Sequence, residues 1–234
     1  MFITLEGPEG SGKSTQSRLL AEYLAECGED VVLTREPGGT AIGNQIREIL
    51  HSHANQELVP AAELLLYSAA RAQIVAEVIR PALAAHRIVV LDRYADSSMA
   101  YQGYGRQIDL EKVRQVTELA TGGLVPDLTF LIDIGVDEGL ARRKDGAARG
   151  EEFNRMDSLS REFYERVRAG YFEMMARQPA RWVRIDGTGT VEEVQEELRR
   201  QMDYALERFH RINSRGSTVH EQVFPVNSDE RREP

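Results

Sequence analysis

The sequence has few lysines, one cysteine and no long apolar run, and each shortage excludes a class of protein. Only three of the 29 basic residues are lysines, and 38 acidic residues give a formal net charge of −9 with a pI near 5.2. A chain this acidic is not a general binder of nucleic acid polymers, which need a net basic field. Any phosphate-binding charge must therefore be local, and it must come mostly from arginine.

The scarcity of cysteine and of apolar runs also bears on location. The single cysteine, Cys27, excludes an internal disulfide. No apolar run approaches the ~18 residues that a membrane-spanning helix needs, so we expect no membrane segment. The first five residues lead straight into a glycine-rich loop, so we expect no signal peptide ahead of it and a cytoplasmic location. With 234 residues, the chain can bury one large core as a single domain.

Residues 7–14 read Gly-Pro-Glu-Gly-Ser-Gly-Lys-Ser, a complete G-x-x-x-x-G-K-[ST] phosphate loop. The glycines let backbone N–H groups turn around an anion, and the helix that follows adds its positive dipole end. Lys13 is placed to reach the β- and γ-phosphates, and the Ser14 hydroxyl to bind Mg²⁺. The motif predicts an ATP site formed by Gly7, Glu9, Gly10, Ser11, Gly12, Lys13, Ser14 and Thr15.

Strand-like runs alternate with helical patterns along the chain. The apolar runs are 2–5, 31–34, 88–91, 128–132 and 182–185, and the helical patterns are 15–27, 41–51, 61–86, 109–121, 136–145, 158–178 and 190–209. We expect Pro81 to kink the third helix. This alternation predicts an α/β fold with a five-stranded parallel sheet flanked by helices. Residues 1–209 form one domain in this prediction, and the polar residues 210–234 form a flexible tail.

Charged residues stand at the carboxyl ends of two predicted strands. Arg35 ends the second strand, and Asp92 and Arg93 follow the third. The carboxyl ends of parallel strands share one edge of the sheet, so the two arginines are placed to hold one anion between them. Asp92 is a candidate partner of Ser14 in binding Mg²⁺. An Asp–Arg pair that merely closes a strand end is the alternative.

Four segments of the chain together resemble one enzyme family. They are Phe2-Ile-Thr-Leu-Glu-Gly-Pro-Glu-Gly-Ser-Gly-Lys-Ser-Thr, Thr34-Arg-Glu-Pro-Gly-Gly-Thr, Asp92-Arg-Tyr and Ser97-Ser-Met-Ala-Tyr-Gln-Gly. In order and spacing they are similar to the thymidylate kinases, which phosphorylate dTMP with ATP. The resemblance covers about residues 1–209. It implies the P-loop nucleoside monophosphate kinase fold, dTDP and ADP as products in dTTP synthesis, and a homodimer.

The resemblance also implies where the acceptor dTMP binds. The arginines at the two strand ends would hold its phosphate. An aromatic side chain and an arginine four residues later would stack on thymine and hydrogen-bond the base. A tyrosine would crowd a 2′-hydroxyl and so favour deoxyribose. The implied dTMP site is Glu9, Arg35, Tyr67, Arg71, Arg93, Ser98, Tyr101 and Gln102.

Phosphoryl transfer also needs a cation on the transferring group. The variable positions of the phosphate loop hold no arginine, so the chain is similar to thymidylate kinases that supply one from a mobile lid. The implied lid is about 139–153. In this lid Arg149 is the implied catalytic arginine, which acts together with Lys13 and Arg93, and Arg142 is implied to contact the ATP phosphates. A solvated basic helix end is the alternative. The turn 186–188 is implied to lie near adenine, and Asp157 is one methylene shorter than the glutamate usual in the family.

Two other functions stay open from the sequence. The chain could phosphorylate another nucleoside monophosphate, or it could be a P-loop nucleotide-binding module without kinase activity. The second alternative leaves Arg35 and Arg93 without a purpose. Transfer between anionic phosphates needs no strong general base, which fits the absence of any histidine near the motifs.

Overall fold

The centre of the computed structural model, which describes residues 1–150 and 153–213, is a five-stranded parallel sheet. The strands are β1 (Phe2–Glu6), β2 (Val31–Arg35), β3 (Ile88–Asp92), β4 (Leu128–Asp133) and β5 (Trp182–Asp186), in the order β2-β3-β1-β4-β5. All five predicted strands are confirmed, and every pairing is parallel. β1, β3 and β4 are buried along their whole length, which is why their sequences are nearly continuous apolar runs.

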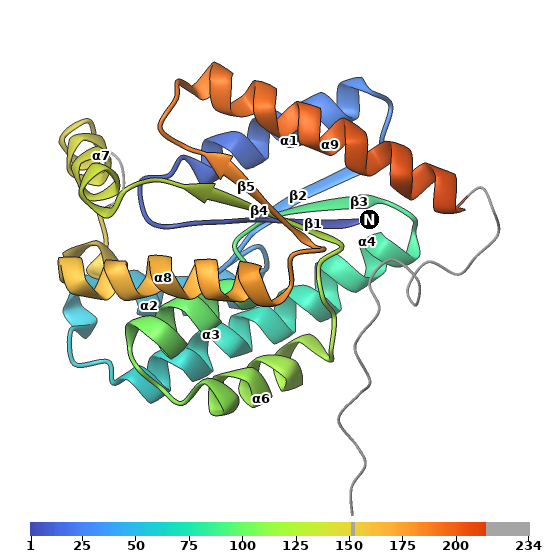
Figure 1. Ribbon diagram of the computed structural model, residues 1–234. Coiled ribbons are helices and arrows are strands. Elements are labelled where there is room, and N and C mark those ends of the chain that lie inside the picture. The colour runs from blue at the N-terminus through green and yellow to red at the C-terminus, as the bar shows by residue number, and fades with distance from the viewer. Residues whose placement is uncertain (151–152, 214–234) are drawn as a thin grey trace, which may run out of the picture.

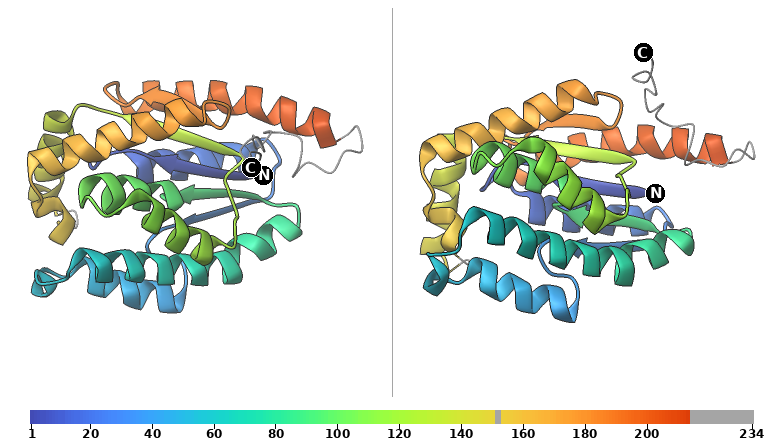
Figure 2. Two further views of the ribbon diagram at one scale, coloured as in Figure 1. Left: turned by 60° about the horizontal axis from the view of Figure 1, so that its bottom comes forward. Right: turned by 90° about the horizontal axis from the view of Figure 1, so that it is seen from below.

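Helices cover both faces of the sheet (Figure 1). On one face lie α1 (Lys13–Glu26) and α9 (Val191–Asn213), and on the other lie α3 (Pro60–Ile74), α6 (Leu110–Thr121) and α8 (Arg161–Arg177). The shorter helices are α2 (Ala41–His51), α4 (Arg80–Ala84), α5 (Ala95–Ser98) and α7 (Val136–Ala148), with π-helical turns η2 (Val75–Ile79) and η3 (Met99–Gly105) and 3-10 turns η1 (His53–Asn55) and η4 (Arg155–Ser158). α2 lies beside α3 (Figure 2).

The core has a layer on each side of the sheet. Leu5 of β1 packs with Leu20 of α1 and Leu198 of α9 on the first face. On the second face, Leu131 of β4 packs with Phe163 of α8 in one cluster, and side chains of β3, α3 and η2 form another. Within residues 1–150 and 153–213, no helix is both long enough and apolar enough to cross a bilayer.

Residues 95–105 are helical, which the sequence pattern did not predict. Their glycines hide the pattern, because Gly103 and Gly105 are poor helix formers. Both lie in close packing: an added Cβ would be 2.7 Å from the Leu110 side chain at the first and 2.6 Å from Phe163 at the second. Tertiary packing, and not local propensity, makes this segment a helix.

Two helix boundaries also differ from the prediction. The irregularity expected at Pro81 lies just before it, in the π-helical turn η2, because proline has no N–H to donate to the carbonyl one turn earlier and its ring crowds that carbonyl. α9 continues four residues past 209, into the expected tail, and His210 Nε2 lies 3.3 Å from Glu29 Oε1. Residues 214–234 of that tail lie outside the described residues.

α7 stands at the carboxyl edge of the sheet (Figure 1) and touches the phosphate loop through two glycines. A Cβ on Gly10 would lie 2.3 Å from the carbonyl oxygen of Gly139, and a Cβ on Gly139 would lie 2.5 Å from the carbonyl oxygen of Glu9. Only glycine allows two backbones to approach so closely. This contact sets the position of α7 relative to the loop.

We therefore expect Gly139→Ala to cost about 1–3 kcal/mol of unfolding free energy, because the new methyl group overpacks against the phosphate-loop backbone. Gly135→Ala is the matched control at the start of the same helix, since nothing lies within 4 Å of its added Cβ. We expect the control to cost less than about 1 kcal/mol. Urea denaturation measures both, and equal costs would contradict the assigned contact.

Candidate active site

A cavity of about 640 Å³ at the carboxyl edge of the sheet brings the predicted site residues together. The predicted residues that line it are Glu9, Gly10, Gly12, Lys13, Ser14, Thr15, Arg35, Tyr67, Arg71, Asp92, Arg93, Ser98, Tyr101, Gln102, Arg142 and Arg149. The other two, Gly7 and Ser11, lie beneath the lining and hydrogen-bond to residues in it. Segments far apart in the sequence therefore converge on one site.

The phosphate loop is closed around its own lysine. Lys13 Nζ donates to the carbonyl oxygen of Pro8 at 2.7 Å and to Ser11 Oγ at 3.1 Å. Burial, together with the charge of Arg93, lowers the pKa of Lys13 to about 8. Gly12, with φ +86°, precedes the first turn of α1. The loop thus presents an ammonium group and the N-terminus of a helix to one cavity, which is the arrangement that binds phosphate.

Two oxygen-bearing side chains stand where a divalent cation would accompany a triphosphate. Ser14 Oγ donates to Asp92 Oδ2 at 2.5 Å, and Asp92 Oδ1 is buried without a hydrogen-bond partner among the described residues. Mg²⁺ is usually held by one or two such oxygens together with phosphates and water. The described residues contain no cluster of three or more His, Cys, Asp or Glu side chains placed for a metal. The Ser14 hydroxyl and the Asp92 carboxylate are oxygen ligands of the kind that Mg²⁺ uses.

Arg93 connects the loop to the opposite wall of the cavity. Its guanidinium donates to the carbonyl oxygen of Gly7 at 3.1 Å, pairs with Glu9 Oε1 at 3.0 Å and lies 4.9 Å from the ring centroid of Tyr101. The Tyr101 hydroxyl also donates to Glu9 Oε1, at 3.1 Å. Burial would raise the pKa of Glu9, but Arg93 and Lys13 outweigh burial and lower it to about 2. Glu9 is therefore a carboxylate at neutral pH.

Arg93 has a backbone φ of +67°, in the left-handed region that non-glycine residues avoid. The buried Glu6 supports this turn: it accepts from the backbone N–H of Tyr94 at 2.8 Å and from the Ser97 hydroxyl at 2.6 Å. The Tyr171 hydroxyl donates to it as well, at 2.9 Å. Ser97 Oγ in turn accepts from Arg93 at 3.3 Å. Glu6 thereby holds the side chain and the backbone of the Arg93 turn.

Arg71 is buried and held on three sides. Its guanidinium donates to Glu36 Oε2 at 2.8 Å, to Ser98 Oγ at 2.8 Å and to the carbonyl oxygen of Tyr94 at 3.0 Å. Tyr67, one turn earlier on α3, is half-buried at the cavity wall. These contacts leave an ordered wall of planar and hydrogen-bonding groups, suited to a nucleobase.

Arg35 is exposed at the mouth of the cavity, at the end of β2. Within the part of the chain that the structure describes, its guanidinium makes no hydrogen bond or ion pair. β2 pairs with β3 so that Arg35 lies opposite Asp92, next to Arg93 in sequence. The expected neighbourhood of the two arginines at one sheet edge is therefore observed.

α7 and the residue that caps its C-terminus supply three arginines to the cavity. Arg142 donates to the carbonyl oxygens of Gly187 at 2.8 Å and Thr188 at 3.3 Å, so it lies on the turn that the resemblance assigned to adenine. Arg143 forms a bidentate ion pair with Asp157: Nε donates to Oδ1 at 2.8 Å and Nη2 donates to Oδ2 at 2.7 Å. Arg149 ends the helix, exposed, at the cavity wall. Residues 151–152 of the expected lid lie outside the described residues.

Several residues that line the cavity had no individual role in the prediction, namely Glu36, Arg47, His51, Arg143, Asp145, Asn154 and Met156, although Glu36 lies in a motif and Arg143 and Asp145 lie in the implied lid. Arg47 and His51 lie four residues apart on α2, a helix that begins directly after the Arg-Glu-Pro-Gly-Gly-Thr segment, and this spacing could have revealed them. A histidine therefore does line the site, although the motifs contain none.

The phosphate loop at the end of β1 faces arginine side chains in the same cavity, at the carboxyl edge of a sheet with the strand order β2-β3-β1-β4-β5. Loop and sheet together are those of the P-loop nucleoside monophosphate kinase fold.

Comparisons with known proteins agree and are more specific. The model of the family described as "Thymidylate kinase" matches residues 5–198. The thymidylate kinase of Exiguobacterium sp. strain AT1b is 51% identical over 208 residues, which cover 89% of this chain and 95% of the relative. That of Roseiflexus sp. strain RS-1 is 50% identical over 206 residues, covering 85% and 91%.

Among solved structures, the crystal structure of thymidylate kinase from Ehrlichia chaffeensis matches with a TM-score of 0.68 and 37% identity, over 86% of this chain and 98% of that one. The chain belongs to the thymidylate kinase family.

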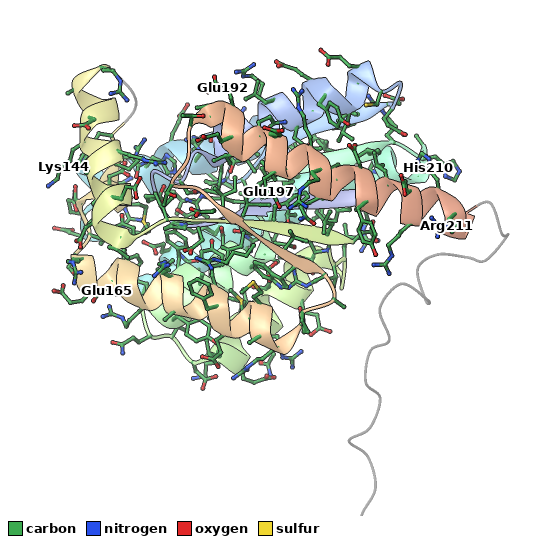
Figure 3. All side chains as sticks on the ribbon, turned by 45° about the horizontal axis from the view of Figure 1, so that its top comes forward. Lys144, Glu165, Glu192, Glu197, His210 and Arg211 are labelled. Atoms are coloured by element: carbon green, nitrogen blue, oxygen red, sulfur yellow. The ribbon has the colours of Figure 1, made fainter. Side chains whose placement is uncertain are left out.

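The buried Glu6 makes stability depend on pH. Burial, reinforced by the charge of Asp96, raises the pKa of Glu6 from 4.5 to about 7, so the folded state binds the proton more tightly than the unfolded state. Proton binding by Glu6 therefore adds to the free energy of unfolding. This added stability is fully present below pH 4.5 and is lost as the pH rises through 7. We therefore expect Glu6→Gln to cost more unfolding free energy at pH 5 than at pH 7, as measured by urea denaturation. Glu192→Gln, on the exposed face of α9 (Figure 3), should show no such difference. A Glu6→Gln cost that is independent of pH would contradict the raised pKa.

Proposed function

We propose that this chain transfers the γ-phosphoryl group of ATP to dTMP, giving ADP and dTDP, with the cavity at the sheet edge as its active site. The single observation that carries the proposal is the position of Arg93. It bonds to Gly7 and Glu9 of the phosphate loop on one side and to Ser97 and Tyr101 of the acceptor wall on the other. A group at this point can contact both substrates.

In this proposal the loop 7–14 binds the ATP phosphates through its backbone N–H groups and Lys13. Ser14 and Asp92 hold the Mg²⁺ that accompanies ATP, which neutralises charge on the β- and γ-phosphates. Support comes from the contact between these two side chains and from the unpartnered Asp92 Oδ1. Arg142 holds the turn 186–188, so the turn and the arginine together provide a wall for adenine.

The acceptor dTMP occupies the other part of the cavity. Arg35 and Arg93 hold its phosphate, Tyr67 stacks on thymine, and Arg71 hydrogen-bonds the base. Tyr101 excludes a 2′-hydroxyl, and Glu9 lies near the sugar and phosphate. Support comes from the shared cavity and from the buried hydrogen bonds that hold Arg71 and Tyr101 in place.

Transfer is a direct in-line displacement, and no covalent enzyme intermediate forms. An oxygen of the dTMP phosphate attacks the γ-phosphorus, the bond between the γ-phosphorus and the β,γ-bridging oxygen breaks, and ADP leaves with the bonding electrons. The acceptor oxygen is already anionic near neutral pH, so no strong base is needed. Lys13, Arg93 and Arg149 stabilise the charge of the transferring group. α7 acts as a lid that limits access of water and hence hydrolysis of ATP. A homodimer and a cytoplasmic location are further parts of the proposal.

The direct test is a coupled assay of ADP release by the full chain with ATP and Mg²⁺, with and without an acceptor. We expect turnover to depend on dTMP and to be faster with dTMP than with dCMP, UMP or AMP. A preference for another monophosphate would favour a different kinase. Slow ATP hydrolysis that dTMP does not stimulate would overturn the proposal in favour of a nucleotide-binding module.

The lid arginine has its own test. Arg149→Ala should lower kcat by about 10³-fold with little change in ATP binding, since a cation on the transferring phosphoryl group acts mainly in the transition state. Lys144→Ala is the control, because Lys144 is exposed and points outward from α7 (Figure 3). We expect the control to keep full activity. An unchanged kcat in Arg149→Ala would remove Arg149 from the catalytic group.

A further inference from the structure

Glu63 of α3 is a buried carboxylate with no role in the proposed transfer. Its side chain is fully shielded from solvent, and it accepts hydrogen bonds from three residues. Arg155 Nη2 donates to Oε2 at 2.6 Å, and Arg106 donates to both carboxylate oxygens, at 3.2 and 2.9 Å. The third donor is Gln102 Nε2, 3.0 Å from Oε1. Glu63 thus joins the cavity, through Gln102, to the buried Arg155 and the half-buried Arg106.

This environment keeps Glu63 charged. Burial alone would raise its pKa, but the hydrogen bonds from Arg106, Gln102 and Arg155 outweigh burial and lower it. An ionised carboxylate accepts hydrogen bonds and donates none. The NH₂ end of the Gln102 amide must therefore face Glu63, because the flipped amide would place two acceptor oxygens against each other.

The opposite end of the same amide carries the acceptor Oε1. Gln102 lines the cavity beside Arg71 and Ser98, and no donor in the described residues hydrogen-bonds to its Oε1. The amide therefore offers the ligand an acceptor. Pyrimidine bases differ at the atom that such an acceptor would meet: thymine and uracil carry N–H at N3, whereas cytosine carries a lone pair there.

We propose that Glu63 is a specificity-determining positioning residue: it holds the amide nitrogen of Gln102, so that Oε1 accepts from N3–H of thymine or uracil and disfavours cytosine. This inference rests on the proposed function, since it assumes that the base of the acceptor lies against Gln102. The inference goes beyond the proposed function because it assigns the choice of pyrimidine to Glu63, a residue that does not touch the ligand.

The test compares kcat/KM of the full-length wild type and Glu63→Gln with dTMP, dCMP and dUMP, using ATP and Mg²⁺. A glutamine at 63 can donate as well as accept, so it no longer fixes the Gln102 amide. We expect the dTMP/dCMP ratio of kcat/KM to fall at least about 10-fold, mainly through the KM of the monophosphates. The dTMP/dUMP ratio should stay constant, because both bases carry N3–H and differ only in the 5-methyl group. The KM for ATP should also stay constant.

Two further variants separate this role from a structural one. Arg106→Lys disturbs the same buried network but leaves the Glu63–Gln102 hydrogen bond, so its dTMP/dCMP ratio should equal that of the wild type even if its stability falls. Gln102→Leu removes the acceptor and should lower the ratio as Glu63→Gln does; it serves as the test if Glu63→Gln fails to fold.

The outcomes are distinguishable. A wild type that does not phosphorylate dTMP contradicts the proposed function itself. A wild type that prefers dTMP to dCMP, together with an unchanged ratio in Glu63→Gln or in Gln102→Leu, overturns the role of Glu63 and leaves the proposed function intact. Equal falls in the dTMP/dCMP and dTMP/dUMP ratios would also overturn it, since only N3 is read by Gln102.

Discussion

The rest of the site depends on one guanidinium group, that of Arg93. It stands at the end of a central strand in a strained backbone conformation, and it bonds to the carbonyl oxygen of Gly7 and the carboxylate of Glu9. A left-handed φ in a non-glycine residue costs about 1–3 kcal/mol and persists only where the surroundings impose it. Here the buried Glu6, at the end of β1, imposes it by accepting from the Tyr94 backbone and the Ser97 hydroxyl. The phosphate loop and the wall at Ser97 and Tyr101 are thus joined through neighbouring strand ends.

Buried carboxylates of this protein organise its cationic groups. Glu6 supports the Arg93 turn, Glu36 pairs with Arg71, and Glu63 binds Arg106 and Arg155. Each ion pair is costly to desolvate and is stabilised by further hydrogen bonds, so each fixes the geometry of a guanidinium or amide at the cavity. A chain with a net charge of −9 can therefore present a local positive field that attracts phosphate. An acidic chain that binds phosphate needs such a local group of cations.

The sheet and the phosphate loop were predictable from the sequence, because apolar runs and a glycine-lysine-serine motif are local signals. The strand-end arginines were predictable as well, since parallel strands place their carboxyl ends at one edge. The helix at 95–105 was not, because Gly103 and Gly105 acquire helical structure only by packing against Leu110 and Phe163. The pair of Arg143 with Asp157 was not predictable, since it depends on how α7 and η4 pack around the cavity, whereas the spacing of Arg47 and His51 on the helix after a motif was a usable signal.

The proposed transfer requires two phosphate sites that share Arg93. A crystal structure of the chain with ADP, Mg²⁺ and dTMP tests this most directly. We expect the β-phosphate of ADP within the loop 7–14, and the dTMP phosphate at about 3 Å from the guanidinium groups of Arg35 and Arg93. A dTMP phosphate bound elsewhere, with both guanidinium groups turned away from it, would contradict the shared site.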